Sequence, residues 1–219
     1  MFLNYFATPI YQTSLWLSDD EISTMKQLLS TRLHLVSGNN NLYTGDLNLR
    51  ENDSQILALP EFDFLRQQIQ QHARVYLSHI TEEANSYKQC ITKSWPVIVE
   101  KNGIVSGHIH SDSHLSAVYY LEDPEPNSDG ELILIRDEDN CMYKMGVIVD
   151  YLNTEVSGRY VSIAPEKNKL VIFPSCTKHT VTPHLGDKPR YSISCDILNV
   201  KKRGNLENSL TPPDTWIIM

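Results

Sequence analysis

The chain has 219 residues and a mass of 25.1 kDa, enough for one substantial hydrophobic core or at most two small domains. Its formal net charge of −8 argues against a protein whose main partner is nucleic acid, because that affinity comes from Lys and Arg side chains that neutralise phosphates. The four cysteines form no Cys-x-x-Cys pair, and the first residues resemble neither a signal peptide nor a membrane span, so we expect a cytoplasmic protein with reduced thiols.

Two helices are predicted in the N-terminal part of the chain. Ser18 and Glu21 have the spacing of a capping box, and apolar residues follow at helical intervals as far as Leu33. A second helix is predicted from about Glu61, just after Pro60. Its apolar stripe comprises Phe62, Leu65, Ile69, Ala73, Tyr76, Leu77 and Ile80. We expect this stripe to pack on a sheet.

From Cys90 onward, short runs of β-branched and aromatic residues predict strands. The runs are CITKSWPVIVE, HLSAVYYL, ELILI, GVIVDYL, RYVSIAP, KLVIFP and RYSISCDIL, and turn sequences such as DPEPNSDG and HLGDKP separate them. Seven or eight short strands with this punctuation indicate an antiparallel sandwich or barrel. We therefore predict one domain over residues 1–219, with helical support over 1–89, a mainly β core over 90–200 and a C-terminal tail over 201–219.

Residues that can bind a metal are concentrated just before one predicted strand. His108, His110, Asp112 and His114 lie within the stretch GHIHSDSHLSAVYYL. In an extended chain, residues two apart point to the same face, so His110 and Asp112 could converge on one ion. A third ligand would come from elsewhere, and the candidates are His179 and His184, of which His179 follows the apolar run LVIFP at the start of another predicted strand. Two histidines and one carboxylate form the facial triad of non-haem Fe(II) oxygenases.

The predicted strand RYSISCDIL carries an unusual polar face. Arg190, Ser192, Ser194 and Asp196 alternate with apolar residues, so they share one side of the strand. An unpaired guanidinium in a core would be very costly. A dicarboxylate ligand would offset that cost, because Arg pairs bidentately with carboxylate and Ser192 adds a hydroxyl.

This set of motifs resembles a known superfamily. His-x-Asp, a distal His and then Arg-x-Ser are similar to the iron(II)- and 2-oxoglutarate-dependent dioxygenases, whose fold is a double-stranded β-helix, also called a jelly roll or cupin-like fold. The segments LNYFATPIYQTSL, SWPVIVEKNG, HIHSDSHLSAVYYLEDPE and LVIFPSCTKHTVTP resemble a bacterial and phage branch of that superfamily. The likeness covers most of the chain in order. It implies a mainly β, α+β architecture in which N-terminal helices support a double-stranded β-helix core.

The resemblance implies that His110, Asp112 and His179 bind Fe(II). The spacing leaves one alternative open, because His108 lies on the same strand face and forms the pair His108–Ile109–His110. A site of three histidines would resemble cupin-type dioxygenases instead. Asp112 is preferred because it supplies the negative charge that Fe(II) chemistry with 2-oxoglutarate usually uses.

The resemblance also implies a cosubstrate site. Arg190 and Ser192 would hold the distal carboxylate of 2-oxoglutarate. Tyr120 matches a tyrosine that helps to bind this carboxylate in prolyl-hydroxylase-like enzymes, with Tyr119 as its competitor.

The implied activity is a hydroxylation that consumes O2 and 2-oxoglutarate and releases succinate and CO2. The expected substrate is an unactivated C–H bond of an amino acid-like small molecule or of a peptide side chain. Desaturation and cyclisation would use the same ligands. Two alternatives remain: a three-histidine cupin-type dioxygenase that needs no 2-oxoglutarate, and a non-catalytic jelly-roll module that binds a metal or a ligand.

Overall fold

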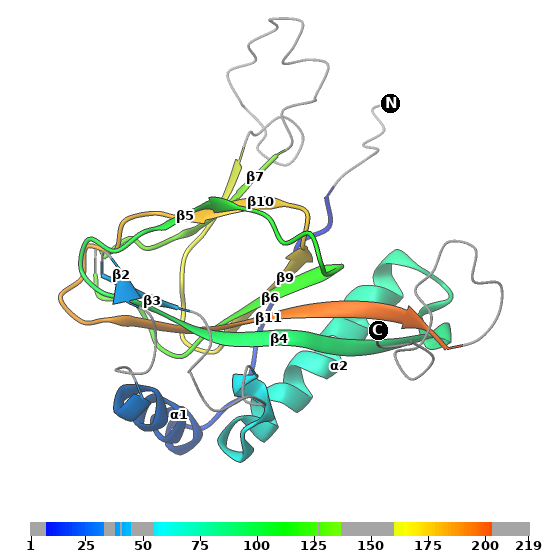
Figure 1. Ribbon diagram of the computed structural model, residues 1–219, viewed down its shortest axis with the longest axis horizontal. Helices are drawn as coiled ribbons and strands as arrows, with labels where there is room; N and C mark the ends of the chain where they lie inside the picture. The colour runs from blue at the N-terminus through cyan, green and yellow to red at the C-terminus, as the bar shows by residue number, and fades with distance from the viewer. Residues whose placement is uncertain are drawn as a thin grey trace, which may run out of the picture.

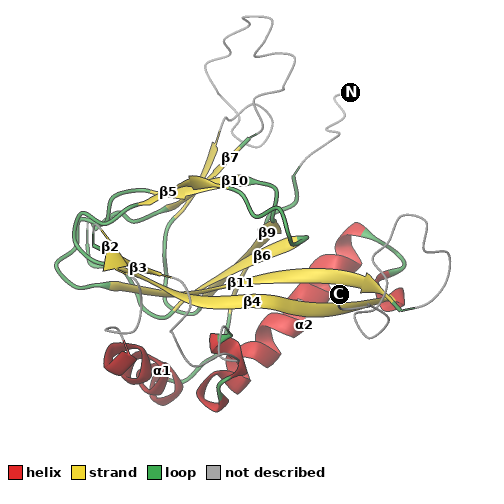
Figure 2. Ribbon diagram, in the orientation of Figure 1, coloured by secondary structure: helices red, strands yellow, loops and turns green. Residues whose placement is uncertain are grey.

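The computed structural model describes residues 8–32, 38–39, 41–44, 55–126, 128–136 and 160–202. Within these ranges, two antiparallel sheets lie face to face, and helices α1 (Asp19–Arg32) and α2 (Asp63–Ile80) lie against the outer face of the larger sheet (Figure 1). Three short 3-10 helices also occur: η2 (Ile56–Ala58), η3 (Pro60–Phe62) and η4 (Ala84–Ser86). Figure 2 shows how strands dominate the rest of the described chain.

The larger sheet has the order β1-β9-β6-β11-β4-β3-β2, with bounds β1 (Tyr11–Ser14), β9 (Lys169–Pro174), β6 (Leu115–Tyr120), β11 (Arg190–Lys201), β4 (Tyr87–Val99), β3 (Leu42–Thr44) and β2 (Gly38–Asn39). The smaller sheet has the order β5-β10-β7-β8, with bounds β5 (Val105–His108), β10 (Lys178–Val181), β7 (Leu132–Ile135) and β8 (Tyr160–Ile163). From β4 onward the chain passes back and forth between the two sheets, apart from the consecutive strands β7 and β8, which both belong to the smaller sheet. The succession from β4 to β11 winds between the sheets as a double-stranded β-helix, so the predicted fold is confirmed.

The helices follow from local sequence signals. Ser18 and Glu21 form the predicted capping box: the Glu21 N–H donates to the Ser18 hydroxyl at 3.3 Å, and the Ser18 N–H donates to the Glu21 carboxylate at 2.7 Å. Helix α2 begins at Asp63, two residues later than predicted, because the chain from Pro60 first forms the 3-10 turn η3.

Two apolar clusters hold the layers together. The first lies between the helices and the larger sheet and includes Leu29, Phe62, Ile69 and Tyr119. The second lies between the two sheets and includes Tyr120, Leu134, Phe173 and Val181. Successive residues of a strand point to opposite faces, which is why Tyr119 and Tyr120 belong to different clusters.

The strand predictions missed several short elements. Strand β5 contains Gly107 and lacks an apolar alternation, and β1, β2 and β3 are too short to give a period-two signal. The predicted strand GVIVDYL and the tail over 203–219 lie outside the described residues. Among the helices that the structure describes, none is both long and apolar enough to cross a membrane.

Candidate metal and cosubstrate site

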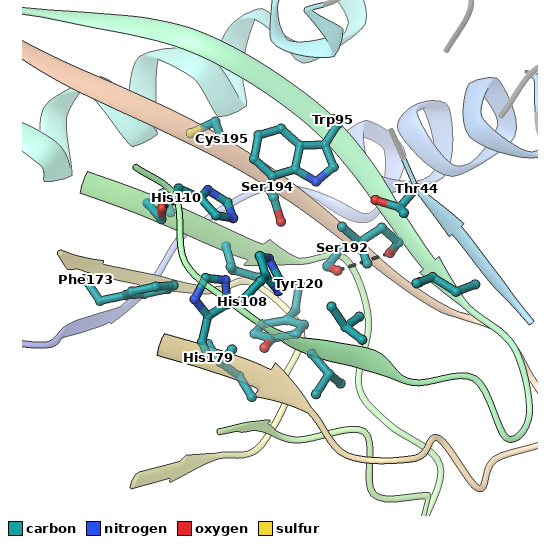
Figure 3. Close-up of a pocket in the computed structure, with 18 of the residues that line it drawn as sticks. Thr44, Trp95, His108, His110, Tyr120, Phe173, His179, Ser192, Ser194 and Cys195 are labelled. Atoms are coloured by element: carbon teal, nitrogen blue, oxygen red, sulfur yellow. Dashed lines mark hydrogen bonds between the residues drawn. The ribbon is translucent and has the colours of Figure 1, made fainter. Parts of the chain in front are cut away.

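A cavity of about 160 Å³ lies between the two sheets. Residues of β4, β6 and β11 line it from the larger sheet, and residues of β5, β7 and β10 line it from the smaller sheet. Figure 3 shows three histidine rings gathered at one end, with Ser192 farther along the larger sheet. The cavity therefore joins the predicted metal-binding region to the predicted cosubstrate region.

His108, His110 and His179 form one cluster. His108 is the last residue of β5, and its backbone is the register partner of His179 on β10. Each residue offers one ring nitrogen as a potential metal ligand, and these three nitrogens lie within 4.8 Å of one another. The ring centroids of His108 and His179 are 4.3 Å apart, and each lies 5.1 Å from that of His110. Modest side-chain rotation would bring all three rings onto one divalent ion.

The hydrogen bonds of the cluster fix which nitrogen of each ring is free. Nδ1 of His108 lies 2.7 Å from the Ser106 carbonyl, and Nδ1 of His179 lies 2.9 Å from the Thr177 carbonyl. A carbonyl only accepts, so both Nδ1 atoms must carry the proton. Nδ1 of His110 lies 2.6 Å from the carboxylate of Asp196. Each Nε2 is therefore left with a lone pair, which is the arrangement that metal-binding histidines use.

Burial keeps His179 in its neutral form. Its side chain is 6% exposed, and Phe173 packs edge-on against the ring. Desolvation, helped by the neighbouring imidazoles, lowers the pKa of His179 to about 4 despite its bond to the Thr177 carbonyl. A neutral imidazole is the form that binds a metal.

The structure does not bring Asp112 into this cluster. The Asp112 carboxylate pairs instead with Lys93 on the surface, and more than half of each side chain is exposed. The hydrogen bond from Lys93 lowers the pKa of Asp112. The chain leaves β5 at His108, so the strand-face argument that aligned Asp112 with His110 does not apply beyond that residue. The third member of the described cluster is His108.

Arg190 is buried at the start of β11 and lines the same cavity. Its guanidinium donates to the Gly130 carbonyl and lies 5.6 Å from the centre of the Tyr120 ring. Its Nε has no hydrogen-bond partner, and within the described residues no carboxylate pairs with it. Burial lowers the pKa of Arg190. A buried cation with an unused donor fits an anionic ligand.

The other predicted cosubstrate residues lie close by. Tyr120 lines the cavity, whereas Tyr119 points to the helical side and donates to Asn168 at 2.7 Å. The Ser192 hydroxyl also lines the cavity, but it donates to the Val97 carbonyl at 3.1 Å. Ser192 would therefore need to rotate before it could donate to a ligand.

The sequence did not assign roles to three further residues of the site. Trp95 of β4 packs 5.5 Å from the His110 ring. Gly130 has a φ of +72°, and a Cβ at this position would lie 3.6 Å from a guanidinium nitrogen of Arg190. Asp196 was predicted to share a strand face with Arg190, but its contact with His110 depends on the turn after β5. Of these three residues, only Asp196 was indicated by the sequence, through the polar face that it shares with Arg190.

The chain was also compared with known proteins. A family model described as "Putative 2OG-Fe(II) oxygenase" matches residues 93–196. This segment contains the histidine cluster, Tyr120, Arg190 and Asp196. No curated protein sequence matches the chain.

Several solved structures share the fold at low sequence identity. HygX from Streptomyces hygroscopicus with nickel and 2-oxoglutarate bound has a TM-score of 0.58 and 11% identity, over 87% of this chain and 83% of that chain. A Trichoplax adhaerens prolyl hydroxylase in complex with a hypoxia-inducible-factor peptide fragment has a TM-score of 0.57 and 16% identity, over 86% and 83%. AviO1 from Streptomyces viridochromogenes has a TM-score of 0.58 and 16% identity, over 95% of both chains. Residues 93–196 of this chain are therefore similar to the putative 2OG-Fe(II) oxygenases, and most of the chain shares their fold.

Proposed function

We propose that the protein is an Fe(II)- and 2-oxoglutarate-dependent hydroxylase with His108, His110 and His179 as its metal ligands. The observation that carries this proposal is the common orientation of the three rings, because each Nδ1 has an oxygen acceptor and each Nε2 is free. Imidazole nitrogen suits Fe(II), so the donor set fits the metal. In this proposal His108 takes the position that the sequence predicted for Asp112.

Arg190 is the proposed anchor for the distal carboxylate of 2-oxoglutarate. Its Nε is unpaired, and its planar guanidinium can bind a carboxylate through two hydrogen bonds. The Tyr120 ring lies beside the guanidinium and limits where the carboxylate can sit. Ser192 is a further candidate contact, once its hydroxyl turns away from Val97.

The chemistry that bound Fe(II) and 2-oxoglutarate supply is a coupled oxidation, in which O2 is consumed, 2-oxoglutarate becomes succinate and CO2, and one oxygen atom enters a substrate C–H bond. The residues of this chain provide binding and orientation. The three histidines hold the metal at one end of the cavity, and Arg190 fixes the cosubstrate. Val97 and Val181 contribute apolar walls that limit the access of water.

A three-histidine dioxygenase that does not use 2-oxoglutarate is the second candidate, because the proposed ligand set contains no carboxylate. Arg190 favours the first candidate. A buried guanidinium with an unused Nε donor and no carboxylate partner among the described residues fits an anionic cosubstrate, which the second candidate would not bind.

The proposed substrate is an amino acid-like small molecule or a peptide side chain. Among proteins of the same fold, HygX has been solved with hygromycin B bound and the Trichoplax prolyl hydroxylase with a peptide fragment. His108 and Ile109 are exposed beside the cavity, so a substrate could reach the metal position from this side.

The test is an anaerobic titration of the metal-free protein with Fe(II) and then 2-oxoglutarate, followed by visible absorption. The proposal predicts a weak metal-to-ligand charge-transfer band that forms only when both are present. Metal binding without any effect of 2-oxoglutarate would favour the second candidate. No binding of iron would contradict both candidates.

A further inference from the structure

A buried carboxylate lies behind the proposed metal ligand His110. Asp196 on β11 is 2% exposed, and its Oδ1 lies 2.6 Å from Nδ1 of His110. Nδ1 and Nε2 are on different edges of an imidazole ring, so Asp196 holds the edge that a metal would not use. This contact joins the larger sheet to the turn that follows β5.

A chain of serine hydroxyls holds Asp196 in place. The Ser116 hydroxyl donates to the same Oδ1 at 2.9 Å and lies 3.0 Å from the Ser175 hydroxyl. A hydroxyl has one proton to donate, so when Ser116 donates to Asp196, Ser175 must donate to Ser116. The Ser113 hydroxyl lies 2.7 Å from that of Ser175 and donates to it. All the donors in this chain therefore point toward the carboxylate.

The network spans three neighbouring strands of the larger sheet: Ser116 is on β6, Asp196 is on β11, and Ser175 directly follows β9. Ser116 and Ser175 are both buried, and the register pairs Asp196 directly with Ser116. The backbone N–H of His110 also donates to the Ser175 carbonyl at 3.0 Å. Both the backbone and the ring of His110 are thus tied to the same group of residues. Neither His108 nor His179 has a carboxylate at its Nδ1, because both donate to carbonyl groups.

We propose that Asp196 is a positioning residue for the metal site, and this inference rests on the proposed ligand set. Asp196 fixes His110 with Nε2 directed toward the other two histidines. It also supplies negative charge next to the metal. The two-histidine, one-carboxylate facial triad has a carboxylate among its own ligands, whereas the proposed set of three imidazoles has none. A carboxylate that accepts the Nδ1 proton makes the imidazole a stronger ligand.

Two substitutions separate orientation from charge. Asp196→Asn keeps an oxygen that can accept from His110 and Ser116, but it removes the charge. Ser116→Ala keeps the charge and removes one hydrogen bond that orients it. Asp112→Asn is the matched control, because Asp112 is a nearby carboxylate that pairs with Lys93 on the surface.

The experiment measures Co(II) affinity of the full chain by competition with a chromophoric chelator, together with the visible d–d spectrum of bound Co(II). Partners of this kind typically change metal affinity by about 10- to 100-fold. We expect Asp196→Asn to weaken Co(II) binding by about 10-fold or more and to alter the spectrum, Ser116→Ala to have a smaller effect in the same direction, and Asp112→Asn to match the wild type.

A His110→Ala variant separates failure of the inference from failure of the proposed ligand set. If His110→Ala weakens binding but Asp196→Asn binds Co(II) with wild-type affinity and spectrum, the role of Asp196 is wrong and the ligand set stands. If His110→Ala binds as the wild type does, or the wild type binds no Co(II), both fail. Thermal unfolding of the metal-free variants checks folding. If Asp196→Asn does not fold, the test depends on Ser116→Ala. An altered Co(II) spectrum in Ser116→Ala supports the inference, whereas wild-type Co(II) affinity and spectrum in this variant overturn it.

Discussion

Arg190 is the residue that most directly separates a 2-oxoglutarate enzyme from other metal-binding jelly rolls. Its guanidinium is buried, flanked by Tyr120 and hydrogen-bonded to Gly130, with Nε unused. Replacing Arg190 by Lys keeps the positive charge but removes the planar pair of donors.

We expect Arg190→Lys to weaken 2-oxoglutarate binding by about ten- to a hundred-fold. This corresponds to the roughly 1.5–3 kcal/mol of a charge-assisted hydrogen bond. The apparent affinity is measured from the charge-transfer titration, and Fe(II) binding should be unchanged. Arg66→Lys on helix α2 is the control, since Arg66 pairs with Asp63 away from the cavity. An unchanged affinity in Arg190→Lys would remove Arg190 from the cosubstrate site.

Gly130 allows Arg190 to take its position. Its φ of +72° lies in the left-handed region, where a side chain costs about 1–2 kcal/mol. A Cβ would also lie 3.3 Å from Nδ1 of His184 and 3.6 Å from a guanidinium nitrogen of Arg190. We expect Gly130→Ala to lower the free energy of unfolding by about this amount and to weaken 2-oxoglutarate binding. Chemical denaturation and the same titration measure the two effects, and wild-type values in both would refute this role.

The choice between His108 and Asp112 shows where sequence reasoning at the residue level ends. A period of two places His108, His110 and Asp112 on one strand face, so the pattern cannot choose between them. In the structure β5 ends at His108, and Asp112 turns toward Lys93 beyond that strand. Arg190 could be assigned to an interior face more readily, because polar and apolar residues alternate along RYSISCDIL. The choice between Tyr119 and Tyr120 stayed open, because the sequence of β6 has no such alternation.

At the scale of elements, the helices were predictable because each begins with a local signal. Ser18 and Glu21 define the start of α1, and the apolar stripe defines α2. Long strands such as β11 were predictable because their β-branched and aromatic residues alternate with polar ones. Strand β5 was not, because Val105 to His108 owes its extended conformation to pairing with β10 rather than to its own residues.

The cap of helix α1 gives a prediction about stability alone. We expect Ser18→Ala to lower the free energy of unfolding by about 1 kcal/mol, because the N–H of Glu21 loses its acceptor. Ser30→Ala is the control within the same helix, since Ser30 only donates back to the Lys26 carbonyl, and it should change stability by less than about 0.5 kcal/mol. Urea denaturation measures both. Equal effects would contradict the capping role, and cosubstrate binding should be normal in both variants.

For the whole molecule, the site lies between the sheets and the helices support the sheet from outside, so a bound ligand should stabilise the entire fold. A ligand present at 100 times its dissociation constant contributes about 2.7 kcal/mol, which is roughly 5–10 °C in melting temperature for a chain of this size. We expect Ni(II) to raise the melting temperature, and 2-oxoglutarate added after it to raise the melting temperature further. In scanning calorimetry of Arg190→Lys, Ni(II) should raise the melting temperature as it does in the wild type, and 2-oxoglutarate should raise it by less than in the wild type. Loss of both increments would indicate a folding defect rather than a lost anchor.

The double-stranded β-helix fold was predicted from the family resemblance, not from the residues alone. Hydrophobic patterns indicated short antiparallel strands, but an open sandwich and a double-stranded β-helix share such patterns. What distinguishes them is the alternation of strands between two sheets, which depends on contacts between distant segments such as the pairing of β11 with β4 and β6.

The most direct test of the proposed three-histidine site compares His108→Ala with Asp112→Ala in the anaerobic Fe(II) and 2-oxoglutarate titration. We expect His108→Ala to lose the charge-transfer band and most of its iron affinity, because it removes one of three clustered imidazoles. Asp112→Ala should keep both, because that carboxylate pairs with Lys93 on the surface. The opposite result, in which Asp112→Ala loses the band and the iron affinity while His108→Ala keeps both, would restore the two-histidine, one-carboxylate site and contradict the three-histidine centre.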